Sequence, residues 1–124
     1  MSKIYDLRKL IELCNNDDEL FEESIKFFYN ETIYNLSQIL IKVKNFEYAD
    51  VKAIAHRMKV NFVIIGSNGC VELCKKIKNE ENNDDIEPLV NKLNMEYFKI
   101  YQQLKIEFPE VLNYEDVGLF KKSR

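Results

Sequence analysis

Glycine and proline are scarce in this chain of 124 residues, which has three glycines and two prolines. With few breaks of either kind, the apolar residues recur every three or four positions almost throughout, and this period predicts an all-helical protein. No apolar run approaches the roughly 20 residues that cross a bilayer. The N-terminal residues MSKIYDLRKL lack the apolar core of a signal peptide. We therefore expect a cytoplasmic protein with no membrane segment.

Cysteine and histidine are also few, with three cysteines and a single histidine, His56. An odd number of cysteines without a secretory context predicts reduced thiols. Cys70 and Cys74 are four residues apart and could share one helix face, but a zinc site needs about four ligands. We expect buried core thiols and no metal site. No Glu-x-x-His pair is present either, which argues against a metal or haem bundle.

The chain also lacks a large excess of positive or negative charge. The formal net charge is −3 with the signs mixed along the chain, and 46% of the residues are hydrophobic, as in a soluble globular protein. A basic face for nucleic acid or for an anionic membrane is missing, although the terminal residues KKSR are locally basic. The three glycines are too scattered to build a phosphate-binding loop. We expect no cofactor, no ATP site and no nucleic-acid partner.

The apolar spacing predicts one short helix followed by four longer ones. The short helix would carry Leu7, Leu10, Ile11 and Cys14, which span too few turns to be stable alone. Asn16, with Glu19 three residues later, is predicted to cap the first long helix. Four apolar stripes follow: Phe21, Ile25, Phe28, Thr32, Leu36, Ile39 and Val43; Val51, Ile54, Ala55, Met58, Phe62 and Ile65; Cys70, Leu73, Cys74 and Ile77; and Ile86, Leu89, Leu93, Tyr97, Ile100 and Leu104.

Short polar segments separate these helices. Gly66 is predicted to end the second long helix, residues 79–85 to form a solvated loop, and Asp84 or Asp85 to cap the last helix, which ends at Pro109. The fold expected for residues 1–124 is one domain, an antiparallel up-down four-helix bundle with a short N-terminal capping helix. The bundle would cover about residues 5–108, and residues 109–124 would form a C-terminal tail without a clear period.

The only histidine points away from the apolar stripe of its helix. At 100° per residue, the stripe from Val51 to Ile65 centres near Met58, and His56 lies roughly 150° from that centre. Lys52, Lys59, Val60 and Val63 share this outer side. An ordinary surface histidine is the simplest interpretation. However, its neighbours on this face are a lysine one turn away and two valines, which are unusual at solvent-exposed helix positions.

Phosphorylation of His56 would explain why a lysine lies beside it. A neutral imidazole offers a nitrogen lone pair without needing a separate base. Once phosphorylated, His56 would carry negative oxygens, which Lys59 could neutralise.

A recognisable pattern is formed by seven residues: Ala55, His56, Lys59, Gly66, Leu73, Cys74 and Ile77. In this pattern the chain resembles the histidine-containing phosphotransfer (HPt) domains, over nearly its whole length from the capping helix around Leu10 to about Phe108. The resemblance implies a four-helix bundle whose exposed histidine takes a phosphoryl group from a receiver-domain aspartate and passes it to another receiver. By position, His56 would be phosphorylated and Lys59 would be its electrostatic partner.

Three positions depart from the family pattern. The family usually has glycine directly after the lysine, where this chain has Val60, and a small residue in place of Val63. A partner's active-site loops would therefore meet side chains at both positions. Lys78 replaces a glutamate that is common in the family.

We expect a monomeric phosphocarrier without independent enzymatic activity, because a receiver domain supplies the acyl phosphate and the magnesium. Its partners would be response-regulator receiver domains and a hybrid histidine kinase. Lys52, Val60 and Val63 would contact the receiver, with the lysine complementing an acidic active site. The alternative is a non-transferring helical module that docks a receiver or kinase without turnover.

Overall fold

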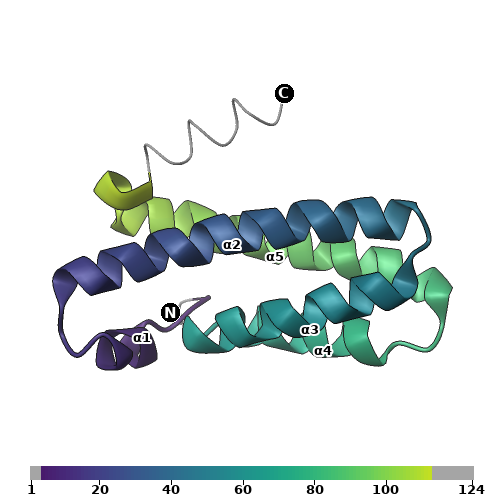
Figure 1. Cartoon of the computed structure of the whole chain (residues 1–124), viewed down its shortest axis with the longest axis horizontal. Coiled ribbons are helices and arrows are strands. Elements are labelled where there is room, and N and C mark those ends of the chain that lie inside the picture. Colours follow the sequence, from purple (N-terminus) through teal and green to yellow (C-terminus); the bar gives the residue numbers. More distant parts are fainter. Residues whose placement is uncertain (1–3, 113–124) are drawn as a thin grey trace.

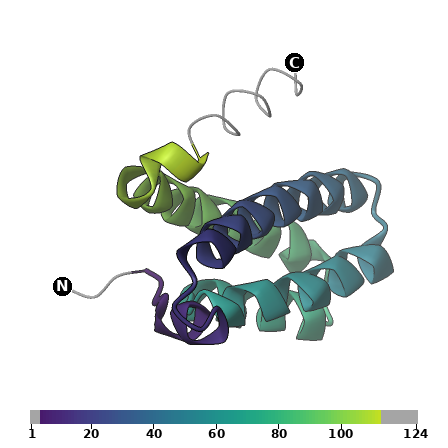
Figure 2. The same cartoon turned by 60° about the vertical axis from the view of Figure 1, so that its left-hand side comes forward.

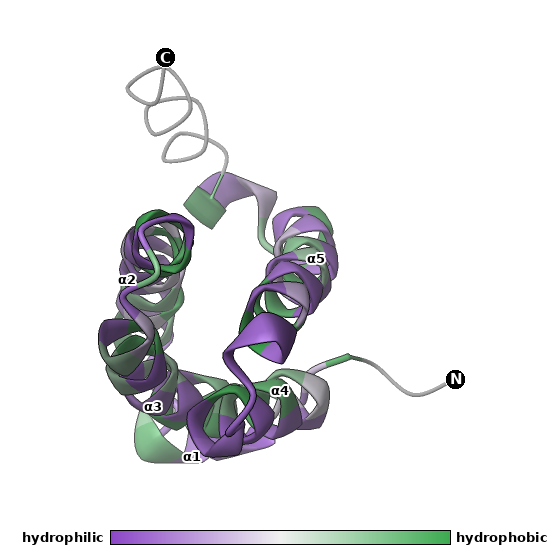
Figure 3. Ribbon diagram, turned by 90° about the vertical axis from the view of Figure 1, so that its right-hand side faces the viewer, coloured by the Kyte–Doolittle hydropathy of each residue, from purple (hydrophilic) through white to green (hydrophobic). Residues whose placement is uncertain are grey.

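The computed structural model describes residues 4–112, and within this range the chain folds into helices joined by turns, with no strand. The helices are α1 (Arg8–Leu13), α2 (Asp18–Lys44), α3 (Tyr48–Ile64), α4 (Asn68–Asn79) and α5 (Ile86–Glu107), with a 3-10 turn at Asn83–Asp85. The four long helices lie side by side in two layers, α2 with α5 and α3 with α4 (Figures 1 and 3). The all-helical prediction is confirmed.

Short connections reverse the chain between successive long helices. Residues 45–47 join α2 to α3, residues 65–67 join α3 to α4, and residues 80–85 join α4 to α5. The short helix α1 lies at the end of the molecule where α2 begins, beside the turn between α3 and α4 (Figure 2). It closes that end of the helical bundle.

The core consists of the predicted apolar stripes with few exceptions. Every residue of the α3 and α4 stripes is buried, and those of α2 and α5 are buried apart from Phe21 and Leu89, which are partly buried. In the short N-terminal stripe, Leu10 and Cys14 are buried and Leu7 is partly buried, but Ile11 is 43% exposed, so its assignment to the buried side is wrong. Tyr29 and Tyr101, which the stripes omitted, are also buried and stack with ring centroids 5.2 Å apart. These two rings join α2 to α5 across the upper layer.

The predicted cap of α2 is wrong by one residue. Asp17, not Asn16, is the N-cap, and its carboxylate accepts a hydrogen bond of 3.0 Å from the Leu20 backbone N–H. Asn15 and Asn16 have φ angles of 55° and 62°, in the left-handed region that asparagine tolerates better than most residues. The two asparagines therefore turn the chain between α1 and α2, and the helix starts after them.

The start of α5 also differs in detail from the prediction. Asp85 is at the N-cap position but its side chain makes no capping hydrogen bond. Asn82 caps instead, because its side-chain oxygen accepts a 3.0 Å hydrogen bond from the Asp84 N–H and starts the 3-10 turn. The loop predicted at residues 79–85 begins one residue later, because α4 includes Asn79, and residues 81–85 are exposed as expected.

The packed structure extends beyond the expected boundary at residue 108. A further helical turn begins at Pro109, and Val111 and Leu112 are buried in the same core. Phe108 packs edge-on against Phe21, with ring centroids 5.6 Å apart. This turn therefore closes the end formed by α2 and α5, while the rest of the expected tail, residues 113–124, lies outside the described residues.

The N-terminal residues bind the turn between α3 and α4. The Asp6 backbone N–H donates a 2.9 Å hydrogen bond to the Ile65 carbonyl, and the hydroxyl of the buried Tyr5 donates to the Glu107 carboxylate. Gly66 has a φ of +71°, as predicted for a helix-ending glycine. The Asp6 backbone lies so close to Gly66 that an added Cβ would be 2.5 Å from the Asp6 carbonyl oxygen.

We predict that Gly66→Ala lowers the free energy of unfolding by roughly 2 to 3 kcal/mol, because left-handed strain adds to the clash with Asp6. Gly69→Ala is the matched control. Its Cβ would meet only Glu96 Oε1, at 3.7 Å, so it should be neutral or stabilising by up to about 1 kcal/mol. Urea denaturation measures both, and equal effects of the two substitutions would contradict the proposed contact.

Candidate functional site

The buried stripe of α3 determines which side chains the helix presents to solvent. The relative solvent exposure is 4% or less for each of four residues of this stripe, Val51, Ile54, Met58 and Phe62. Since these residues hold one side of α3 against the core, His56 on the opposite side is exposed, near the middle of a 17-residue helix. The structure thus places the imidazole on a rigid element rather than on a loop.

His56 forms no hydrogen bond or ion pair with any residue in the range 4–112. Both ring nitrogens of an exposed imidazole without such a contact can be reached by a partner molecule. This arrangement differs from that of a structural histidine, whose ring is oriented by a backbone or carboxylate acceptor.

Lys59 lies one turn beyond His56 and is half-buried on the side of α3 that faces α4. Burial, together with the neighbouring Cys70, raises the pKa of the Cys74 thiol to about 12, and the Lys59 ammonium acts in the opposite direction. The charge of Lys59 therefore acts near the contact between α3 and α4, where packing restricts the lysine side chain. A cation held in this way loses less conformational entropy on binding an anion than a fully exposed lysine.

Lys52 makes a structural contact that the sequence did not predict. Its Nζ donates a 2.6 Å hydrogen bond to the backbone carbonyl of Glu80, the residue that ends α4. Carbonyls at a helix C-terminus have no partner within the helix and carry partial negative charge. The expected docking residue Lys52 is thus engaged at the end of α4.

The contact between Lys52 and Glu80 also indicates the register of the two antiparallel helices. With residue 52 beside residue 80, His56 lies at about the level of residue 76, one turn of helix away. Three lysines of α4 are exposed near this level along the axis, namely Lys75, Lys76 and Lys78. Lys75 forms a 3.3 Å ion pair with Glu72.

Val60 and Val63 are exposed, by 56% and 41%. An open groove of about 460 Å³ runs between α1, the start of α2 and the end of α3, and its apolar lining includes Leu13, Leu20 and Phe27. Asn61, Ile64 and Ile65 line it from α3, whereas the two valines do not.

The sequence analysis missed the exposed apolar residues of α2. Leu20, Phe27, Tyr34 and Ile41 are exposed by 45% to 61%, and they are spaced seven residues apart. This spacing places them on one helix face, and it is readable from the sequence. Only the periodicity of the buried stripe was used, so the second stripe on the same helix went unnoticed.

All three cysteines are free and buried, as predicted. Burial raises the pKa of the Cys70 thiol to about 11, while a hydrogen bond with Ser67 lowers it and the Glu96 carboxylate raises it further. Thiols with raised pKa values are poor metal ligands and poor nucleophiles at neutral pH. Within residues 4–112, no group of three or more histidine, cysteine, aspartate or glutamate side chains could hold a metal ion.

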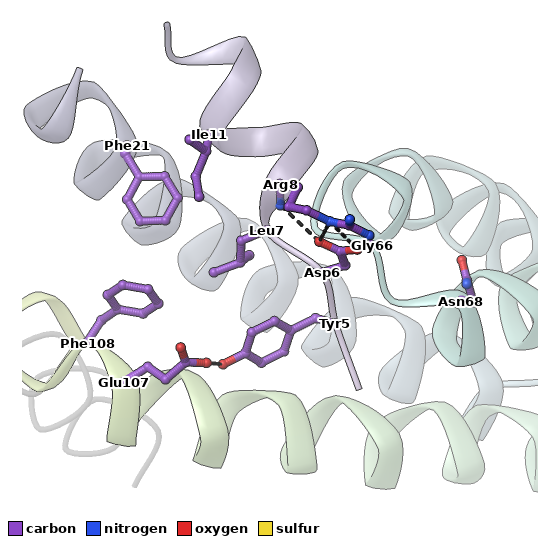
Figure 4. Close-up of a pocket in the computed structure, with 10 residues that line it drawn as sticks. All are labelled: Tyr5, Asp6, Leu7, Arg8, Ile11, Phe21, Gly66, Asn68, Glu107 and Phe108. Carbon is purple, nitrogen blue, oxygen red and sulfur yellow. Dashed lines mark hydrogen bonds and ion pairs between the residues drawn. The ribbon is translucent and has the colours of Figure 1, made fainter. Parts of the chain in front are cut away.

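An open pocket of about 630 Å³ lies near the N-terminal residues (Figure 4). Arg8 forms a 2.6 Å ion pair with Asp6 there, and the hydrogen bonds from Arg8 lower the pKa of the Asp6 carboxyl to about 2. Gly66 also lines this cavity, and it is ten residues from His56, roughly 15 Å along a helix. The cavity is therefore not part of the His56 site.

Comparison with protein-family models, with curated proteins and with solved structures finds no match. Among residues 4–112, no helix has both the length and the apolar character needed to cross a bilayer.

We predict that Lys52→Met lowers the free energy of unfolding by about 1 to 2 kcal/mol, because the Glu80 carbonyl loses a charged donor. Lys59→Met is the matched control, since it removes the same charge from the same helix and side, and it should change stability by less than about 0.5 kcal/mol. Thermal or urea unfolding measures both. Equal stability of the Lys52 variant and the parent would assign Lys52 to the solvated surface.

Proposed function

We propose that the protein is a phosphorelay intermediate that accepts a phosphoryl group on His56 and passes it on. The observation that carries this proposal is the exposed, uncontacted imidazole in the middle of α3, with Lys59 held one turn away. The fold that fits this role is an antiparallel up-down four-helix bundle with α1 as its cap. The HPt-like pattern around His56 supports the same function.

The donor is an aspartyl phosphate in a receiver domain. An unprotonated imidazole nitrogen of His56 attacks phosphorus, so that an N–P bond forms as the acyl O–P bond breaks and the aspartate leaves as a carboxylate. Nothing is oxidised or reduced, and the second step reverses this exchange with another aspartate. The chain needs to supply only a positioned nucleophile, charge neutralisation and a docking surface.

The residues near His56 fit these three needs. Lys59 can pair with the phosphoryl oxygens and complement the charge of an acidic receiver site. Val60 and Val63 are exposed by 56% and 41%, and they supply the apolar part of the docking surface. Lys52 is a residue of α3, but its ammonium binds the Glu80 carbonyl. Its charge therefore lies at the end of α4 and contributes to the docking surface only from there.

The second candidate is a docking module that binds a receiver or kinase without phosphoryl transfer. Val60 favours it, because a 56% exposed branched side chain one turn from His56 would keep a partner's loops at a distance. The two candidates differ in one measurable outcome, the appearance of phosphohistidine.

We predict that His56→Gln abolishes phosphoryl acceptance, because glutamine has a similar polarity but no nucleophilic nitrogen. The purified protein is mixed with phosphorylated receivers, and acid-labile, base-stable label on this chain is measured. The substitution is exposed, so the free energy of unfolding should change by less than about 0.5 kcal/mol. Label that persists in the variant, or no label on the parent with any receiver that binds it, would contradict the carrier function.

We predict that Lys59→Ala slows phosphoryl acceptance about tenfold or shortens the phosphohistidine lifetime to a similar extent. The loss of one cation beside the transferred group corresponds to about 1 to 2 kcal/mol in the transition state. Arg57→Ala is the matched control, since it removes a charge next to His56 from an exposed position. If both variants lose rate equally, Lys59 contributes only to the general potential.

A further inference from the structure

The long helix α2 has a second apolar stripe on the side opposite its buried one. This outer stripe consists of four residues spaced seven apart: Leu20, Phe27, Tyr34 and Ile41. Their exposures are 45%, 61%, 58% and 53%. At 100° per residue, the centre of the outer stripe lies roughly 150° from Thr32, which is buried near the centre of the opposite side. The four side chains therefore lie outside the core of the bundle.

The outer stripe is long and has further apolar surface beside it. From Leu20 to Ile41 it runs roughly 31 Å along the helix axis. Leu20 and Phe27 also line the groove toward α1 and α3. Ser37, a direct neighbour of Tyr34 and Ile41 on the helix, lines an apolar groove of about 610 Å³ between α2 and α5. An exposed apolar surface of this extent is a feature of interaction sites.

The order of residues in the outer stripe is the same from both ends. An aliphatic residue lies at each end, and aromatic residues occupy the two inner positions. A two-fold axis midway between residues 30 and 31 would place Leu20 beside Ile41 of a second copy. The same axis would place Phe27 beside Tyr34 of the second copy, where two aromatic rings can pack edge to face. A contact across a two-fold axis requires a self-complementary surface of this kind.

The charges of α2 distinguish the two directions in which a second copy could pack. Residues 18–31 include five carboxylates and residues 32–44 include none. Parallel packing would bring the two acidic halves together, whereas antiparallel packing places each acidic half beside the carboxylate-free half of the other copy. The helix dipoles then also oppose each other. Only Glu31, next to the axis, would lie near its own copy.

The two lysines in the second half of α2 are already in ion pairs with other helices. Lys42 pairs with Asp50 at 3.1 Å and Lys44 with Glu87 at 3.4 Å. The electrostatic advantage of antiparallel packing therefore comes from keeping the acidic halves apart, and not from new ion pairs.

We propose that the outer stripe is a dimer interface, at which α2 packs antiparallel against α2 of a second copy of this chain. A dimer departs from the monomer expected from the sequence, and it does not depend on the proposed phosphoryl transfer. Each copy buries a core of its own, so dimerisation is not needed for folding. A contact between two single helices is at the small end of stable interfaces. We therefore expect a dissociation constant on the order of micromolar.

The first test is the oligomeric state of the full chain, measured by sedimentation from about 1 to about 500 µM. Ile41→Asp should weaken the dimer by about tenfold or more, because it places a charge between apolar side chains of the two copies. Ile106→Asp is the matched control, with the same substitution at a 79% exposed residue of α5, and it should change the dissociation constant by less than about twofold. Both positions are exposed, so both variants fold, which circular dichroism verifies.

The second test is cross-linking, which determines the direction of packing. Asn30→Cys places an exposed thiol beside the two-fold axis, so a short bismaleimide should join the two copies. Glu23→Cys is the control, because antiparallel packing separates residue 23 from its own copy by roughly 22 Å along the axis. The native cysteines are buried and should not react. Glu31→Gln should tighten the dimer severalfold, because it removes the like charges at the axis.

Three results would overturn the proposal. They are a monomer over the whole concentration range, equal effects of Ile41→Asp and Ile106→Asp, and cross-linking through residue 23 instead of residue 30. The first result would leave the outer stripe to a different protein. The second would place the contact between copies elsewhere, and the third would make the dimer parallel.

Discussion

The burial of one side of α3 is the constraint on which the candidate site depends. Val51, Ile54, Met58 and Phe62 are packed between α2 and α4, and turning the helix to bring His56 inward would expose all four. Each such side chain contributes about 1.5 to 3 kcal/mol through burial, so the rotation would cost an amount comparable to the whole stability of a small domain. The direction of the imidazole is therefore set by side chains that never touch it.

The neighbouring helices determine what surrounds the imidazole. Lys52 reaches the end of α4, and Gly66 allows the N-terminal residues to bind the turn between α3 and α4. Both contacts hold α4 in one position relative to α3. The exposed lysines of α4 thereby lie at about the level of His56 along the helix axis.

Periodicity was sufficient to predict the helices and the exposure of His56, because one buried side determines the opposite side. It was insufficient wherever the outcome depends on two elements. The contact of Lys52 with Glu80 requires the register between α3 and α4, and the burial of Val111 and Leu112 requires the crossing of the last turn over α2 and α5. The predicted N-cap of α2 was wrong for a local reason. Asn15 and Asn16 both adopt left-handed conformations, and the capping pattern in the sequence does not specify this.

Exposed apolar residues occur in both layers of the bundle, at Val60 and Val63 on α3 and at Met95 and Phe98 on α5. A carrier that exchanges partners gains from weak and short-lived docking around its reactive side chain, because tight binding there would delay release. A contact on a separate surface can raise the effective concentration of a partner without occupying the reactive one. In the proposed carrier, His56 on α3 and the apolar groove between α2 and α5 are in different layers, so a contact at the groove would leave His56 accessible.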